Sequence, residues 1–227
     1  YIHFYVPESP VWLKAQEDKK KGLAGLAAPS AKLSDLFRGP NLRTFVFAVV
    51  ICTSALMAYW GVNTWLPTIL VKERGMSAKD VSTFLMALNI VSLPAYFVSS
   101  FIVDRIGKRL MIAISAGLSA VSLYAWLGFA WEPQVFFLMG LLAWVTASAM
   151  WAGFGAYLAE QFPTNIRAVG VSSSFAIGRG VMSFVPMALG AAATATASLA
   201  TVIGYMAVFY LIAGVGAFML HDSTEAL

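Results

Sequence analysis

Arg179 is the residue of this sequence whose surroundings most clearly indicate chemistry. It stands between Gly178 and Gly180 in a long stretch that has no other charged residue. A guanidinium group stays protonated and presents a planar fork of N–H donors, so it can bind a carboxylate but cannot relay a proton. A structural pair with a carboxylate or carbonyl elsewhere in the protein is an equally acceptable role. Arg179 is therefore a candidate for binding an organic anion.

A second group of candidate ligand-binding side chains lies around Tyr59. At 100° per residue along a helix, Tyr59, Trp60 and Asn63 fall in one arc, and Tyr59 and Asn63 are one helical turn apart. They could present a hydroxyl, an indole and an amide to a substrate. The alternative is that Asn63 only forms a hydrogen bond with a neighbouring helix.

Aromatic and small polar residues share another helical line. Trp144, Ser148 and Trp151 follow one another at helical spacing, and an aromatic wall beside small residues suits a planar ligand. Asn89 lies on the polar stripe of a different segment and is a further candidate contact. The two tryptophans could instead be ordinary packing or interfacial anchors, and membrane serines often join helices. Ser148, Trp151 and Asn89 are therefore predicted substrate contacts.

Catalytic chemistry finds no support in the sequence. His3 and His221 lie at opposite ends of the chain, and Cys52 is its one cysteine. These residues form no metal-ligand pattern, no nucleophile–base pair and no phosphate-binding loop. We expect no enzyme activity, no cofactor and no metal site.

The composition places these residues in a membrane protein. Hydrophobic residues make up 59% of the chain and charged residues 11%, and the mean hydropathy is +0.76. A soluble domain carries roughly 25% charged residues, so the bilayer is the expected solvent. Uncharged runs long enough to cross it predict an all-α membrane protein with six transmembrane helices at 44–71, 81–103, 110–131, 135–159, 168–192 and 199–220.

The fifth of these helices would hold Arg179 near its middle. A charge there costs at least about 2.5 kcal/mol, so we expect Arg179 to face the interior of the bundle. Gly170, Ser174 and Gly178 form a face of small residues that favours close helix packing.

The Lys and Arg residues predict the orientation in the membrane. Eleven of the fifteen lie on the side of the two chain ends, and three lie on the other side. Positive loops stay in the cytoplasm, so both termini are expected to be cytoplasmic. The positive charge is then a topology signal, and we expect no nucleic-acid partner. Residues 1–43 are expected to be the end of a preceding helix plus a cytoplasmic linker, and 221–227 a cytoplasmic tail.

Four short patterns, in register with the six helices, resemble a known family. They are Pro7-Glu8-Ser9-Pro10-x-Trp12-Leu13, Asp104-Arg105-x-Gly107-Lys108-Arg109, Glu160-x-Phe162-Pro163-Thr164-x-x-Arg167 and Gly178-Arg179-Gly180. Together they resemble the second half of a major facilitator superfamily transporter, in the group of sugar and metabolite:proton symporters. The resemblance covers nearly the whole chain.

The resemblance implies a twelve-helix protein, of which these six helices would form the C-terminal half as a 3+3 inverted repeat. It implies a bacterial inner-membrane or plasma-membrane carrier that works by alternating access together with an N-terminal half. Because no Asp or Glu lies inside the six predicted helices, a coupling proton would be handled by that other half.

Departures from the family pattern bear on the substrate. Val11 replaces a usual arginine, and Ser100 stands where a glycine is common. The first helix lacks the paired glutamines of the sugar porters and looks more like the organic-acid:proton symporters. A small organic acid, aromatic acids included, is therefore the expected substrate. A sugar or polyol carrier, or a membrane scaffold or sensor that does not transport, are the alternatives.

The motifs at the cytoplasmic side indicate gating. Asp104, Arg105 and Arg109 surround a tight turn at Gly107 and could pair with the other half of the carrier in one conformational state. Glu160 and Arg167 could do the same. The alternative is that the basic residues only set the topology, although this would not explain the acidic Asp104.

Overall fold

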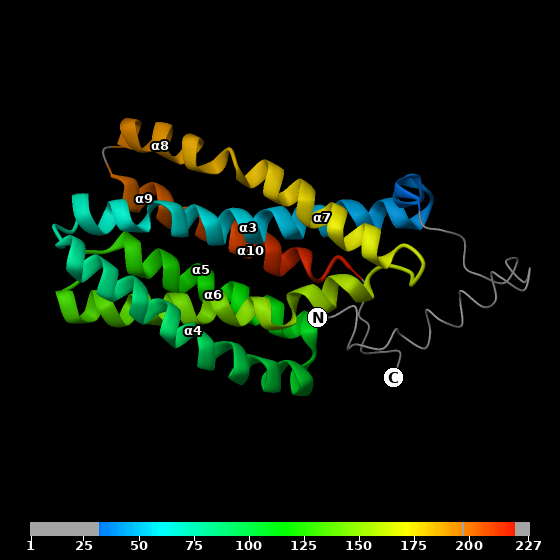
Figure 1. Ribbon diagram of the computed structural model, residues 1–227, viewed down its shortest axis with the longest axis horizontal. Coiled ribbons are helices and arrows are strands. Elements are labelled where there is room, and N and C mark those ends of the chain that lie inside the picture. Colours follow the sequence, from blue (N-terminus) through cyan, green and yellow to red (C-terminus); the bar gives the residue numbers. More distant parts are fainter. Residues whose placement is uncertain (1–31, 197, 221–227) are drawn as a thin grey trace, which may run out of the picture.

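The computed structural model describes residues 32–196 and 198–220, and within them helices are the only regular elements. Their order is η1 (Leu33–Phe37), α3 (Pro40–Lys72), α4 (Ala78–Ile106), α5 (Lys108–Gly128), α6 (Pro133–Glu160), α7 (Arg167–Met182), α8 (Val185–Thr196), α9 (Leu199–Gly204) and α10 (Ala207–Gly216) (Figure 1). Six segments of this part of the chain are long and apolar enough to cross a membrane. The predicted all-α membrane architecture is confirmed.

Two of the six membrane segments are divided. The fifth, Arg167–Thr194, consists of α7 and α8, and the sixth, Leu199–Gly216, consists of α9 and α10. The break in the fifth has a local cause, because Pro186 has no N–H and its ring would clash with the carbonyl of Met182. The α7 helix ends at Met182, where the Ser183 N–H donates to the Arg179 carbonyl at 3.1 Å. Arg179 therefore lies in the last turn of α7, beside the break.

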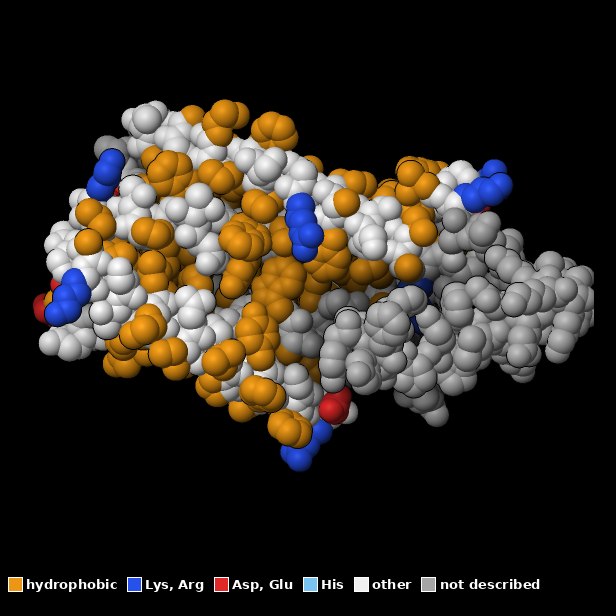
Figure 2. All heavy atoms as spheres, viewed as in Figure 1, with side chains coloured by type: hydrophobic (Ala, Val, Ile, Leu, Met, Phe, Trp, Pro, Cys, Tyr) orange, Lys and Arg blue, Asp and Glu red, His pale blue; other side chains and the backbone are white. Residues whose placement is uncertain are grey.

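The α3 helix is the central element of the bundle. It packs against α7, α8, α9 and α10, whereas α6 packs against α4 and α5 (Figure 1). Its buried side is apolar and runs from Phe45 to Leu70. Large apolar side chains also cover the outside of the molecule, while most charged side chains lie toward its two ends (Figure 2). This pattern is that of an integral membrane protein, whose hydrophobic flank faces lipid.

The α7 helix approaches α3 very closely through its small residues. The buried residues of α7 are Gly170, Ser174 and Gly178, which are the three predicted to form a packing face. A Cβ added at Gly178 would lie 3.0 Å from Leu56 Cδ1 and 3.2 Å from the backbone nitrogen of Thr53. A side chain at this contact would be tightly packed and its neighbours would have to shift, and the three small residues are the buried ones of α7, so the small-residue face is confirmed.

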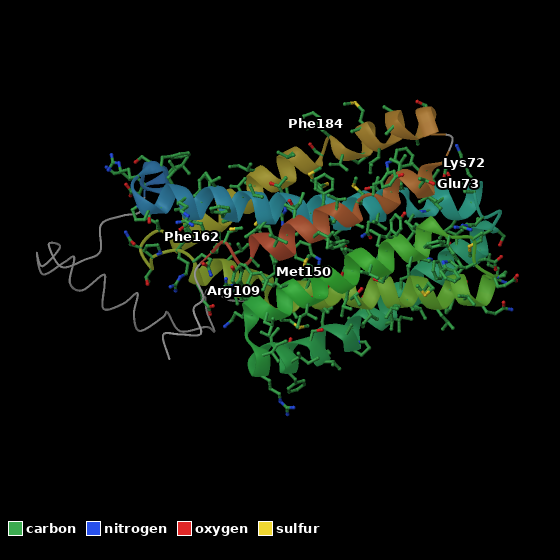
Figure 3. All side chains as sticks on the ribbon, turned by 180° about the vertical axis from the view of Figure 1, so that it is seen from behind. Lys72, Glu73, Arg109, Met150, Phe162 and Phe184 are labelled. Carbon is green, nitrogen blue, oxygen red and sulfur yellow. The ribbon has the colours of Figure 1, made fainter. Side chains whose placement is uncertain are left out.

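A polar clamp joins two membrane segments at one end of the bundle. The Glu73 carboxylate, at the end of α3, accepts hydrogen bonds from the backbone N–H groups of Leu199 and, at 3.1 Å, Ala200. These N–H groups begin α9 and have no acceptor within that helix. Figure 3 shows Lys72 and Glu73 at this end and Arg109 and Phe162 at the opposite end.

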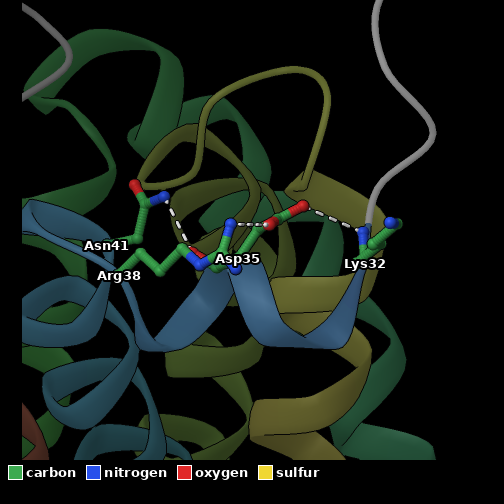
Figure 4. A network of polar contacts seen from close by, with 4 residues as sticks. All are labelled: Lys32, Asp35, Arg38 and Asn41. Carbon is green, nitrogen blue, oxygen red and sulfur yellow. Dashed lines mark hydrogen bonds and ion pairs between the residues drawn. The ribbon is translucent and has the colours of Figure 1, made fainter.

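The segment before α3 is held by its own polar network. The Asp35 carboxylate accepts from the Lys32 backbone N–H at 3.0 Å and pairs with Arg38 at 3.6 Å, and Asn41 donates to the Asp35 carbonyl at 3.1 Å (Figure 4). Leu36 is fully buried and anchors η1 to the bundle. The predicted helix end, the first proline-rich motif and the C-terminal tail lie outside the described residues, so the division at residues 43 and 220 stays a prediction.

The close α3–α7 contact gives a first prediction. Gly178→Ala should lower the thermal stability of the purified protein, because the new Cβ meets the α3 backbone and overpacking costs about 1–3 kcal/mol. Gly180→Ala is the matched control, since a Cβ there meets nothing within 4 Å. Thermal unfolding of both variants in detergent checks this, and equal melting temperatures would contradict the packing described.

The Glu73 clamp gives a second prediction. Glu73→Ala should destabilise the protein by about 1 kcal/mol, because loss of a helix-capping acceptor costs that much. Glu132→Ala is the control, since the Glu132 side chain makes no capping hydrogen bond to α6. Denaturant unfolding should show a lower midpoint for the Glu73 variant alone. Equal midpoints for the two variants would mean that the clamp does not stabilise the bundle.

Candidate functional site

The predicted residues of α3 and α6 meet in a cluster of aromatic rings. The Tyr59 ring centroid lies 5.9 Å from that of Trp60, 5.7 Å from that of Trp151 and 6.0 Å from that of Trp144. The Trp60 and Trp151 rings both meet Tyr59 edge to face, a favourable arrangement for aromatic pairs. Two helices that are distant in sequence thus bring three predicted substrate contacts together.

Two further rings connect this cluster to Arg179. The Trp151 ring lies 5.0 Å from Phe154, which lies 6.0 Å from Phe175 of α7. The guanidinium carbon of Arg179 is 6.0 Å from the centroid of Phe175, within cation–π range. We call the continuous series Trp60, Tyr59, Trp151, Phe154, Phe175 and Arg179 the aromatic path.

Much of the aromatic path is accessible at the surface of the described chain. Trp60 is 46% exposed and Arg179 is exposed, whereas Tyr59, Trp151 and Phe175 are half-buried. Phe154 is fully buried and packs against the rings of Trp151 and Phe175. A flat ligand could therefore contact the edges of several rings and the guanidinium together.

Within the six described helices Arg179 is exposed, because the neighbouring Gly178 occupies the close contact with α3. The expectation that Arg179 faces the interior of a larger bundle stays a prediction. The Arg179 guanidinium forms no ion pair with any carboxylate in residues 32–196 or 198–220. Arg179 is therefore presented outward from the bundle beside Phe175.

The two predicted asparagines use part of their hydrogen-bonding capacity within their own helices. The Asn63 side-chain amide donates to the Tyr59 carbonyl, and the Asn89 amide donates to the Leu85 carbonyl, each at 2.8 Å. Asn63 is half-buried at the cluster, whereas Asn89 is exposed on α4. Their roles as substrate contacts stay predictions.

The structure places Ser148 between helices rather than on the aromatic path. Its side chain is fully buried, and its Oγ lies 3.1 Å from Ser92 Oγ of α4. This hydrogen bond joins α6 to α4, which is the common role of membrane serines. Ser148 therefore does not reach the accessible surface in this structure.

A small cavity lies beneath the aromatic path. It has a volume of ≈ 10 Å³, about that needed for one water molecule, and Tyr59, Asn63, Trp144 and Tyr210 lie in its wall. The indole N–H groups of Trp126, Trp144 and Trp151 are buried and have no hydrogen-bond acceptor in the structure. Trp126 and Trp144 line this cavity. An indole N–H can only donate. This region is therefore rich in unused donors.

The loop motifs form contacts inside the described bundle. Lys108 Nζ lies 2.9 Å from Glu160 Oε1, and Arg109 donates to the Phe218 carbonyl at 2.8 Å. Arg167 Nε donates to the Phe162 carbonyl at 3.4 Å. Glu160, Arg109 and Arg167 thus join the ends of α5, α6, α7 and α10 in this structure. Their expected pairing with another half of a carrier stays a prediction.

The turn between α4 and α5 needs its glycine. Gly107 has a φ of 84°, a conformation that residues with a side chain rarely adopt. Asp104 and Arg105 precede it and are both exposed. Their gating role is not tested by these contacts and stays a prediction.

Phe154 and Phe175 were missed in the sequence analysis. Phe154 lies three residues after Trp151 and Phe175 lies four residues before Arg179, so both share a helix face with a predicted residue. Helical spacing could have found them. The contact between them, which links α6 to α7, could not be read from the sequence.

The arrangement can bind but has no catalytic grouping. Among the described residues, no cluster of His, Cys, Asp or Glu could hold a metal ion. The accessible groups are aromatic rings, hydroxyl and amide groups and one guanidinium, and unused indole N–H donors lie buried behind them. These groups suit a planar molecule that carries a hydrogen-bond acceptor or a negative charge.

Comparison with known proteins agrees with this chemistry. Residues 2–186 match the sequence profile of the Major Facilitator Superfamily. The chain is 23% identical over 190 residues to the cis,cis-muconate transport protein of Acinetobacter baylyi, an alignment that covers 83% of this chain and 45% of the relative. It is 30% identical over 146 residues to the niacin transporter NiaP of the same organism, with 63% of this chain and 32% of the relative covered.

A third relative is the probable 4-methylmuconolactone transporter of Cupriavidus pinatubonensis, 26% identical over 80% of this chain and 40% of the relative. The chain thus spans less than half the length of each of these relatives. The names of these three relatives describe transport proteins, which agrees with the expectation that this chain is not an enzyme.

Thiol labelling can test the accessibility of the site. The native Cys52 is fully buried, so a single introduced cysteine reports its own position. With the protein in nanodiscs, Trp60→Cys should react with a polar maleimide, because Trp60 is accessible, and Ser148→Cys should stay unreacted. Val121→Cys, at a 70% exposed position on the apolar flank of α5, is the control for a thiol that faces lipid. Labelling of the Ser148 variant as fast as the Trp60 variant would contradict the burial described.

Proposed function

The chain belongs to the Major Facilitator Superfamily, and on that basis we propose that it is the C-terminal six-helix half of a secondary transporter for a small organic acid. The transporter works by alternating access and moves the acid together with protons, with an N-terminal six-helix half completing the substrate cavity. It lies in a bacterial inner membrane with both ends of this chain in the cytoplasm, as the distribution of Lys and Arg favours.

The observation that carries the proposal is the outward-facing Arg179 at the end of the aromatic path. A guanidinium at membrane depth faces protein or a water-filled cavity, because its transfer into lipid is costly. Within the described residues it has an aromatic neighbour, Phe175, but no carboxylate partner. A substrate carboxylate supplies the negative charge that Arg179 does not find among the described residues.

The remainder of the site favours a planar acid. Tyr59, Trp60 and Trp151 offer ring edges and faces, which contact a flat molecule over a large area at little entropic cost. The unused N–H of Trp151 is buried beside these rings, so it could donate to a ligand acceptor only after the ring or its neighbours shift. Two of the relatives are named as transporters of muconate and of niacin, and both of these molecules are planar carboxylic acids.

Proton coupling needs a group that changes protonation, and Arg179 cannot provide it. The described membrane segments contain no Asp or Glu except near their ends, for example Glu73, Asp104 and Glu160. The titrating carboxylate is therefore assigned to the N-terminal half. Arg179 would then affect substrate affinity without being the proton carrier.

Transport by the intact protein tests this proposal. Proteoliposomes that contain an internal pH dye are given benzoate, an aliphatic carboxylate or a hexose, and the ligand-induced proton flux is recorded. We expect flux with the carboxylates. Arg179→Gln should reduce it at least about tenfold, because a hydrogen bond to a charged group is worth about 1.5–3 kcal/mol. Arg179→Lys should recover part of it, since it restores the charge but not the planar fork.

Arg43→Gln is the matched control, because Arg43 also lies over an aromatic ring one turn away, Phe47, but at the start of α3. It should transport as the wild type does. Flux with the hexose would overturn the organic-acid assignment. Equal carboxylate flux in the Arg179 and Arg43 glutamine variants would remove Arg179 from the site.

A further inference from the structure

A long apolar groove separates α4 from α5 on the side away from the aromatic path. Its volume is ≈ 530 Å³, and Val98, Ile102 and Ile106 of α4 face Ile114 and Leu118 of α5 across a floor that includes Val145 of α6. Figure 1 shows α4 standing apart from its neighbours over the part that ends at Ile106. The groove therefore opens along the flank of the bundle.

Two of the three hydroxyl groups in the groove wall, those of Ser115 and Thr146, are already used, and the third is that of Ser99. Ser115 Oγ donates to the Met111 carbonyl within α5. Thr146 Oγ1 lies 3.1 Å from the Leu142 carbonyl and 3.1 Å from Ser122 Oγ. With these two groups paired, the Ser99 hydroxyl is the one side-chain polar group of the groove wall without such a bond, and the other lining side chains are apolar. A wall of this composition favours an apolar occupant.

The groove is long enough to hold the hydrocarbon chain of one lipid leaflet. Its α4 side extends from Val91 to Ile106, which at 1.5 Å per residue is roughly 22 Å. One leaflet of a bilayer contributes about 15 Å of hydrocarbon. Because α4 is a membrane segment, lipid chains surround this flank at high concentration.

Cationic side chains gather where the groove ends. Ile106 and Met111, both in the groove wall, flank the turn that carries Arg105, Lys108 and Arg109. Arg105 is exposed, and Lys108 is one-third exposed although it pairs with Glu160. With Asp104 also nearby, the three cations outnumber the two carboxylates, so the described residues at the groove end carry a net positive charge. Such basic ends between membrane helices attract anionic head groups.

We propose that this groove binds one acyl chain of an anionic phospholipid, whose phosphate lies at the Arg105–Arg109 turn. The site requires a bilayer but not transport, so it stands independently of the proposed function. The bound chain fills the space between α4 and α5, and the head group contacts the turn to which a gating role is assigned. Lipid composition would then affect how firmly that turn is held.

Native mass spectrometry of the intact protein tests the site directly. Phosphatidylglycerol and phosphatidylcholine with identical acyl chains are offered to the detergent-purified protein, and the retained lipid is counted. We expect the wild type to retain phosphatidylglycerol preferentially. Val145→Phe, which fills the floor of the groove, should reduce retention of both lipids. Val121→Phe adds the same ring to the apolar flank of α5 outside the groove and should retain the lipids as the wild type does.

The charged end is tested separately. Arg105→Gln should reduce the preference for phosphatidylglycerol over phosphatidylcholine about fivefold, the factor for one cationic residue near an anionic surface. Arg43→Gln should leave the preference unchanged. Equal retention by the two Val→Phe variants would overturn the groove as the lipid site, for example because another helix of the protein covers it. An unchanged preference in the Arg105 variant would overturn the assignment of the phosphate.

Discussion

The close packing of α7 against α3 is the contact on which the arrangement of the site depends. Gly178 brings the α7 backbone so near to Thr53 and Leu56 that even one added Cβ would require its neighbours to shift. With glycine at that contact, the next residue, Arg179, is directed away from α3. The same rotation of α7 sets Phe175 against Phe154 of α6. A contact between small residues therefore determines where the guanidinium of the site lies.

The two ends of the bundle differ in how they are joined. At one end Glu73 connects α3 to the first turn of α9 across a large separation in sequence. At the other end Lys108 pairs with Glu160, and Arg109 reaches the carbonyl of Phe218. These contacts join α3 to α9 at one end, and α5 to α6 and to the residues after α10 at the other. The proposed alternating access, in which two halves move against each other, would need such connections within each half.

The sequence was sufficient to predict the six membrane segments and the residues that share a helix face, but not the breaks within the fifth and sixth segments. It predicted six membrane segments and the face of Gly170, Ser174 and Gly178, because helical spacing repeats along the chain. It did not predict which neighbour covers each face. Ser148 was expected at the substrate, but Ser92 of another helix covers it. Arg179 was expected to face the interior of the bundle. It is exposed on the six described helices, and its position inside a twelve-helix protein stays a prediction.

Equilibrium binding of benzoate and of benzamide to the intact protein tests the central claim most directly. The two molecules share a flat ring and differ in the charge that Arg179 is proposed to bind. The account predicts that the wild type binds benzoate more tightly and that Arg179→Gln removes this difference while weak binding of the ring persists. Equal affinity of the wild type for the acid and the amide would contradict it, because the site would then recognise the ring alone.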